Sequence, residues 1–75
     1  MQINPTTYQV QMKIFEKAGC TYSRTKGDHL IYNYPGAIRP VIIPKYREVP
    51  TFVIKNNMRT VGMSREEYLA LLEII

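Results

Sequence analysis

The central stretch of the chain reads CTYSRTKGDHLIYNYPGAIRPVII over residues 20–43. It is rich in β-branched and aromatic residues, which favour strands. Turn-forming residues interrupt it at Lys26-Gly27-Asp28 and again at Pro35-Gly36. Pro35 suits the first central position of a type II turn, and Gly36 suits the second, where φ is positive. The pattern therefore predicts three consecutive strands joined by turns, at residues 20–25, 29–34 and 38–43.

Helix signals precede this stretch. Asn4 and Pro5 are typical of an N-cap and a first helical position. Thr6 and Gln9 have the spacing of a capping box. Apolar residues then recur at helical spacing, and Gly19 stands where a left-handed C-terminal cap is expected. We expect the first helix between these signals.

Two further helices are expected after the strands. Pro50 and Thr51 begin a periodic segment that ends at Gly62. Ser64 and Glu67 form a second capping box, which opens a helix that continues to the last residue. The order of elements is α-β-β-β-α-α, so we expect one small α+β domain over residues 1–75, with a three-stranded antiparallel sheet packed on helices.

Composition narrows the classes of function. The chain has 75 residues, one cysteine and one histidine, which leaves no internal disulfide and no structural zinc site. No apolar run approaches the ~20 residues of a membrane helix, and no targeting signal is visible, so a cytoplasmic protein without a membrane partner is expected. The formal net charge of +4 favours polyanionic partners, with nucleic acid first among them.

His29 is the one side chain suited to proton transfer near neutral pH. It follows the turn Lys26-Gly27-Asp28, where a lysine could hold a phosphate while the imidazole takes a proton from a hydroxyl. A lone histidine at a strand start is more often an exposed or structural residue, and Asp28 is more often a turn cap than an orienting group. Alternation puts His29 and Ile31 on the strand face opposite Leu30, and which face is core stays open.

A second basic segment follows the third strand. Lys45, Tyr46 and Arg47 interleave two cations with an aromatic ring, a combination that can contact phosphates and stack a base. A solvated loop in which Tyr46 covers the edge of the core explains the same residues equally well. Lys26, Lys45, Tyr46 and Arg47 are the candidate RNA-binding residues that the residue types themselves indicate around His29.

The chain resembles the HicA toxins of bacterial and archaeal toxin–antitoxin modules. The similarity runs from residues 15–34, which contain Lys-Gly-Asp-His-Leu-Ile-Tyr, through residues 41–44 to residues 50–64. It implies a fold similar to a double-stranded-RNA-binding domain, an mRNA interferase activity that arrests translation, and a HicB-like antitoxin as partner. The family's catalytic histidine corresponds to His29 and its glycine to Gly27, where the close turn leaves backbone N–H groups free to approach a phosphate. The resemblance thus adds Gly27 and Asp28 to the candidate RNA-binding residues.

The chain departs from the family pattern at two positions. Many members carry serine before the histidine and a second histidine after the third strand, where this chain has Asp28 and Tyr46. An acidic neighbour favours the protonated imidazole and repels phosphate. With one histidine, the second proton-transfer role would fall to Lys45, Tyr46, Asp28 or solvent.

The expected reaction is endonucleolytic cleavage of RNA in which the 2′-hydroxyl is the nucleophile, so that neither metal nor cofactor is required. His29 would act as general acid or base, and Lys26 with Lys45 or Arg47 would stabilise charge on the phosphorane. The main alternative is a noncatalytic RNA-binding module with the same architecture. A third is a protein-interaction domain with Tyr32 or Tyr34 as its anchor. The sequence does not indicate the oligomeric state of the free protein.

Overall fold

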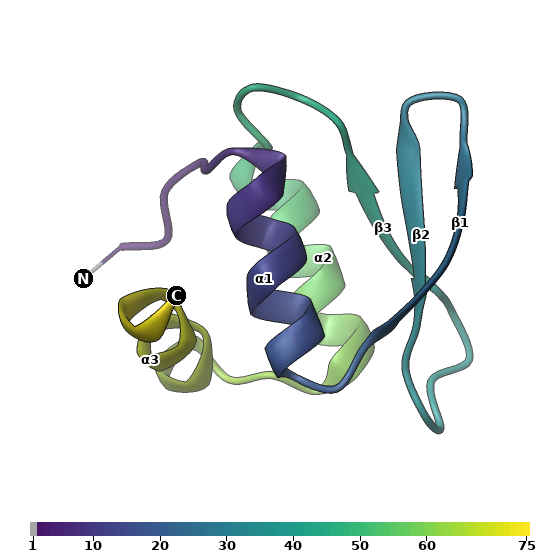
Figure 1. Ribbon diagram of the computed structural model, residues 1–75. Coiled ribbons are helices and arrows are strands. Elements are labelled where there is room, and N and C mark those ends of the chain that lie inside the picture. Colours follow the sequence, from purple (N-terminus) through teal and green to yellow (C-terminus); the bar gives the residue numbers. More distant parts are fainter. Residues whose placement is uncertain (1) are drawn as a thin grey trace.

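The computed structural model describes residues 2–75 and has the predicted order of elements (Figure 1). Three helices and three strands make up this part of the chain: α1 (Tyr8–Lys17), β1 (Thr21–Lys26), β2 (His29–Asn33), β3 (Val41–Pro44), α2 (Thr51–Val61) and α3 (Arg65–Ile74). The α-β-β-β-α-α order and the α+β class are thus confirmed.

The strands form one antiparallel sheet in the order β1-β2-β3, with β2 in the centre. Leu30 and Tyr32 of β2 belong to the hydrophobic core, so their face of the strand packs on the helices. His29 and Asn33 are exposed and lie on the other face, which settles the alternative that the sequence left open.

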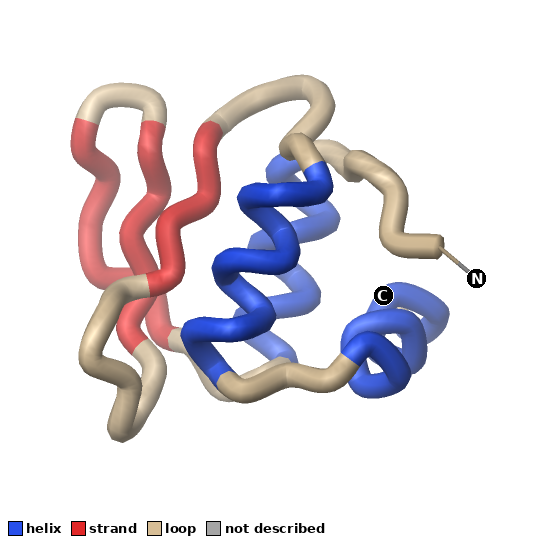
Figure 2. Tube along the Cα trace, turned by 180° about the vertical axis from the view of Figure 1, so that it is seen from behind, coloured by secondary structure: helices blue, strands red, loops and turns tan. Residues whose placement is uncertain are grey.

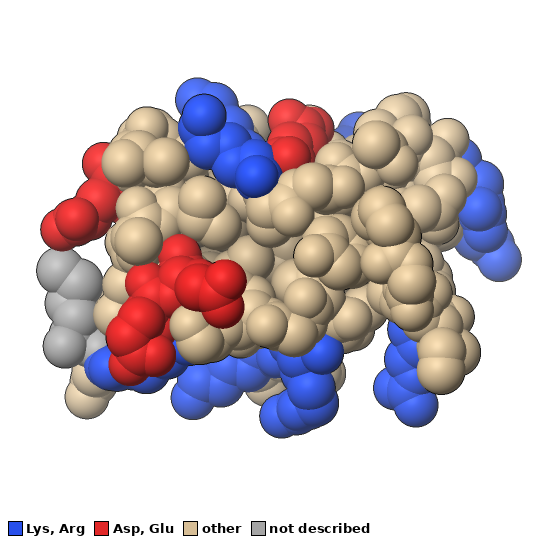
Figure 3. Space-filling view, turned by 90° about the horizontal axis from the view of Figure 1, so that it is seen from below, with Lys and Arg blue, Asp and Glu red and all other residues tan. Residues whose placement is uncertain are grey.

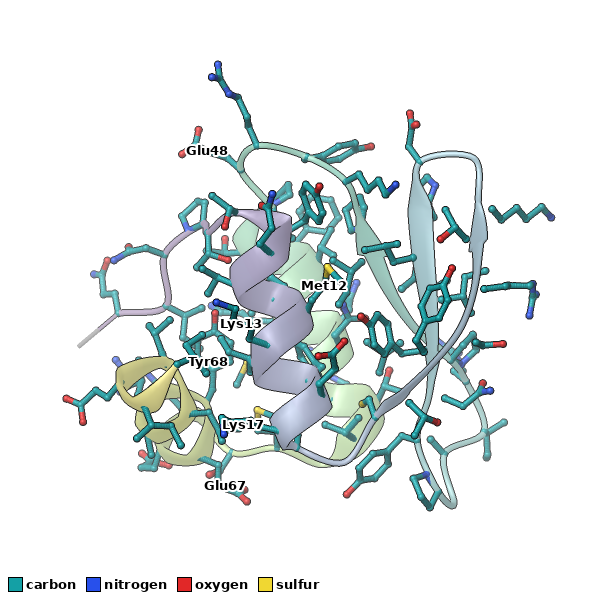
Figure 4. All side chains as sticks on the ribbon, in the orientation of Figure 1. Met12, Lys13, Lys17, Glu48, Glu67 and Tyr68 are labelled. Atoms are coloured by element: carbon teal, nitrogen blue, oxygen red, sulfur yellow. The ribbon has the colours of Figure 1, made fainter. Side chains whose placement is uncertain are left out.

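Helices α1 and α2 lie side by side between the sheet and α3 in both views (Figure 1, Figure 2). Their apolar stripes meet the inner face of the sheet, and Phe15 and Ile54 are fully buried there. Gln11 of α1 joins α1 to α3, because its Nε2 lies 2.8 Å from the hydroxyl of Tyr68. Tyr68 lies between the two helices (Figure 4) and is itself fully buried.

Helix α2 also supplies hydrogen-bond partners for backbone groups at the outer edge of the sheet. The side chain of Asn57 accepts a hydrogen bond from the backbone N–H of Ile42 (3.3 Å) and donates one to its carbonyl (2.9 Å). Because β3 is an edge strand, these backbone groups have no neighbouring strand to pair with. The amide of Asn57 takes the place of that strand and holds α2 beside β3.

The predicted start of the first helix was wrong. Its N-cap is Thr7, whose side chain accepts from the N–H of Val10 (3.3 Å), and the predicted Asn4 cap and Thr6–Gln9 capping box do not form the helix start. Thr6 instead makes an isolated antiparallel bridge with Val49, whose N–H donates to the Thr6 carbonyl at 2.6 Å. A contact with a distant segment thus overrides a local capping signal.

The third strand is shorter than predicted and begins at Val41 rather than at Ile38. The type II turn is confirmed, since the Ala37 N–H donates to the Tyr34 carbonyl (3.1 Å) and Gly36 has φ of 82°. Pro40 has no N–H for a strand ladder, so residues 37–40 remain a loop.

The other capping residues predicted at the ends of the helices agree with the structure. Gly62 caps α2 with φ of 69°, and Gly19, just beyond the Ala18 cap of α1, has φ of 109°. Ser64 and Glu67 form both hydrogen bonds of the capping box at the start of α3. These bonds favour the ionised carboxylate, so the pKa of Glu67 is lowered from its usual value.

We predict that Asn57→Ala lowers the free energy of unfolding by about 1–3 kcal/mol, because the Ile42 groups lose their partner while they remain partly buried. Denaturant unfolding followed by circular dichroism measures the change. Asn56→Ala is the matched control on the exposed face of the same helix, with an expected change within about 0.5 kcal/mol. Equal losses in the two variants would show that the amide does not hold the edge strand.

Cys20 provides a second test of the core. Its side chain is 4% exposed, and burial raises the pKa of its thiol to about 11. Because the thiolate is the reactive species, we expect alkylation at pH 8 to be at least about 100-fold slower in the native protein than in denaturant. A Cys20→Ser, Thr21→Cys variant, which carries an exposed thiol one residue later, should react rapidly without denaturant. Native Cys20 reacting at the same rate as that exposed thiol would refute the buried placement.

Candidate active site

His29 is the first residue of β2 and directly follows the hairpin turn. It is exposed, and its Cα partners are Lys26 on β1 and Pro44 on β3. Side chains of directly opposed residues project from the same face, with Cβ atoms about 4.5–5.5 Å apart. The imidazole therefore has a lysine on one side and the end of β3 on the other.

The turn itself consists of Gly27 and Asp28. Gly27 has φ of 59°, a left-handed conformation at the first central position that matches a type II′ hairpin turn. A Cβ there would meet nothing within 4 Å, so conformation rather than lack of space explains the glycine. The Asp28 carbonyl accepts from the Lys45 N–H at 2.7 Å. Among residues 2–75, no hydrogen bond joins the Asp28 carboxylate to His29.

The segment after β3 separates two residues that are adjacent in the sequence. The Tyr46 N–H donates to the Pro44 carbonyl (2.8 Å), which is a tight three-residue turn centred on Lys45. Tyr46 then lines the same groove as His29, whereas Lys45 lines a second hollow on the inner side of the sheet. Arg47 is exposed and lines neither.

The groove beside His29 runs between the β3 edge, the loop of residues 36–40 and helix α2. Its volume is about 860 Å³, and its lining includes Tyr46 and the exposed side of Ile42. None of the described residues that line it is acidic, while Arg39 and Arg59 add positive charge. The groove thus combines a histidine, cations and apolar surface in one place.

The sequence alone did not single out most of the groove residues, and the chemically notable ones among them are Arg39, Phe52 and Arg59. Phe52 carried a usable signal, because it lies off the buried stripe of α2 and is an aromatic residue on a solvent-facing side. Arg39 was assigned to a strand, and a single arginine on a helix such as Arg59 has no distinguishing spacing. Only the tertiary arrangement brings the three beside His29.

The second hollow, of about 450 Å³, lies at the other edge of the sheet, between α1 and β1. Tyr22 and Tyr32 meet there edge to face, with ring centroids 5.7 Å apart. Burial, together with a 2.8 Å hydrogen bond from Tyr32 to Glu16, raises the pKa of the Tyr32 hydroxyl. This tyrosine is therefore a neutral structural group, and Lys45 is the one cation in the described lining of the hollow.

Charge is unevenly distributed over the surface. In the view from below, most visible acidic side chains gather at the α3 end, while Lys and Arg side chains project along the lower edge and from the sheet end (Figure 3). Within residues 2–75, no group of three or more His, Cys, Asp or Glu side chains is placed to hold a metal ion. None of the helices in this range is long and apolar enough to span a bilayer.

A comparison with family models gives a match over residues 11–63 to a model described as the HicA toxin of bacterial toxin–antitoxin systems. The match covers more than half of the chain and includes the three strands, the His29 hairpin and α2. No curated protein matches the chain. The chain therefore belongs to the HicA toxin family and is the toxin of a toxin–antitoxin pair, with an antitoxin as its partner.

Proposed function

We propose that this toxin is an endoribonuclease that cuts mRNA, with His29 as its catalytic acid–base group. The observation that carries the proposal is the position of His29, which is exposed and lines a groove that holds arginines and no described acidic residue. Lys26 lies directly across the hairpin from it. RNA, a polyanion with a hydroxyl next to each phosphate, fits this arrangement of cationic side chains around the imidazole of His29.

The reaction begins with attack of a ribose 2′-oxygen on the adjacent phosphorus. The imidazole of His29 removes the 2′-hydroxyl proton as the new P–O bond forms, and the bond to the 5′-oxygen of the next nucleotide breaks. The leaving 5′-oxygen takes a proton from the Tyr46 hydroxyl or from solvent, and the other product ends in a 2′,3′-cyclic phosphate. The proton that His29 removed returns to solvent and restores the neutral imidazole. This route uses the substrate's own nucleophile and therefore requires neither metal nor cofactor.

Lys26 is the best-placed cation for the charge that builds up on the phosphorane, since its side chain projects from the same sheet face as His29. Lys45 faces the other hollow and is therefore less suited to that role than the sequence suggested. Tyr46 shares the groove with His29, which favours its hydroxyl as the group that contacts the leaving oxygen. Gly27, Asp28 and Arg47 are exposed. Arg47 and the backbone N–H groups of Gly27 and Asp28 are the groups there that can contact the RNA backbone, because the Asp28 carboxylate repels phosphate.

The proposal also includes the partner and the compartment. A HicB-like antitoxin would neutralise the toxin by covering the face that carries His29, and the toxin would act on mRNA in the cytoplasm. The family membership supports this assignment, and the exposure of His29 leaves its face accessible to either partner.

We predict that His29→Ala lowers the rate of RNA cleavage by about 10²- to 10⁴-fold, the usual contribution of one acid–base side chain. Labelled single-stranded RNA is incubated with the protein in EDTA, and product lengths and ends are resolved on a denaturing gel. Asn33→Ala is the matched control, because Asn33 is an exposed residue on the same face at the far end of β2. It should cleave like the wild type.

Fragments with 2′,3′-cyclic ends from the wild type and from Asn33→Ala, but not from His29→Ala, would support the mechanism. RNA that is retarded on a native gel yet keeps its length with the wild-type protein would replace this proposal with a noncatalytic RNA-binding module. Unchanged cleavage by His29→Ala would remove His29 from the mechanism.

A further inference from the structure

One face of α2 turns aromatic and basic side chains toward the groove. Phe52, Asn56 and Arg59 follow one another at i, i+4 and i+7, so they share a face of the helix, and all three line the groove. Arg59 donates from Nη1 to Oδ1 of Asn56 at 3.1 Å, which restrains its guanidinium on this face. The core stripe of the same helix, with Ile54 and Met58, faces the other way.

The aromatic rings of the groove are exposed. Phe52 is 66% exposed and Tyr46 is 47% exposed, although aromatic side chains of this size are usually buried at least in part. No described element covers them, and Ile38 in the adjoining loop is fully exposed as well. Burial in the core therefore does not explain why an aromatic residue occupies position 52.

Charge narrows the choice of ligand. The described lining of the groove contains two arginines and His29 but no acidic residue. Exposed aromatic rings interleaved with cations are the combination that binds unpaired nucleotides, since every base has a face that can stack and every linkage carries a negative charge. A volume of about 860 Å³ leaves room for one or two nucleotides.

We propose that this groove is a nucleobase subsite, in which an unpaired base next to the cleaved phosphate stacks on Phe52. Tyr46 supplies a second aromatic surface, and Arg59 contacts the adjoining phosphate. Bases in a duplex are already stacked on each other and cannot enter, so the subsite selects single-stranded RNA. The inference rests on the proposed function and adds to it the residues that select the substrate.

The test measures binding rather than cleavage. A fluorescent single-stranded RNA with 2′-O-methyl groups lacks the nucleophile, so its dissociation constant reports on the subsite even if the protein has no nuclease activity. We expect Phe52→Ala to weaken binding by about 5- to 150-fold, the range for loss of one stacked base. Phe52→Trp should keep the affinity, whereas Phe52→Leu, which retains apolar volume but no ring, should lose it.

Matched controls separate the subsite from general effects. Ile74→Ala removes an equally exposed apolar side chain (66%) from α3, and Tyr22→Ala removes an exposed ring (54%) from the other hollow. Arg65→Ala changes the net charge as Arg59→Ala does, but at the start of α3. Only the groove variants should weaken binding to single-stranded RNA. The affinity for duplex RNA should change no more in any groove variant than it does in Arg65→Ala.

Three results would overturn the inference. Wild-type affinity of Phe52→Ala and Arg59→Ala for the single strand would show that no base enters the groove. Equal losses in Phe52→Ala and Ile74→Ala would show a nonspecific effect. If Phe52→Ala weakened only the complex with the antitoxin, the groove would be a protein-docking surface instead. Circular dichroism checks that each variant is folded. If the protein did not cleave RNA through His29 but the groove variants still lost affinity, the proposed function would fail and the nucleobase subsite would stand.

Discussion

The position of helix α2 depends on one buried amide. Asn57 is 6% exposed and pairs with both backbone groups of Ile42, so the helix is held at hydrogen-bonding distance from the edge of the sheet. An unpaired N–H and carbonyl at this edge would cost free energy and offer a template for another strand. With α2 placed in this way, the face that carries Phe52 and Arg59 turns toward the end of β3, and these elements form a groove that His29 also lines.

The two faces of the central strand β2 have different roles, although Ile31, on the same face as His29, is also buried. Its inner residues, Leu30 and Tyr32, pack in the core and anchor the sheet on the helices. His29 lies on the outer face at the strand end, where the tight turn keeps it exposed while the ladder bonds of β2 hold its backbone. A rigid backbone with an accessible side chain suits an acid–base group, because its position is set by the fold and not by the substrate.

Local chemistry made much of the fold predictable. The turn at Pro35-Gly36 and the capping box at Ser64 depend on neighbouring residues, and both agree with the structure. The predicted start of the first helix disagrees with the structure, because Thr6 pairs with a segment more than forty residues away. The candidate site divides in the same way: His29 carried its own chemical signal, whereas the groove beside it joins a loop, a strand edge and a helix that no local pattern connects.

The central claim is that one face of this toxin, formed by His29 and the groove of α2, holds single-stranded RNA. The most direct test is a titration of ¹⁵N-labelled protein with a 2′-O-methyl single-stranded RNA, followed by amide chemical shifts. The account predicts the largest changes at residues 29, 36–42 and 52–60, with α3 unaffected. Largest changes in the second hollow, at Tyr8, Gln9 and Tyr22, would contradict it and place the RNA at the opposite edge of the sheet.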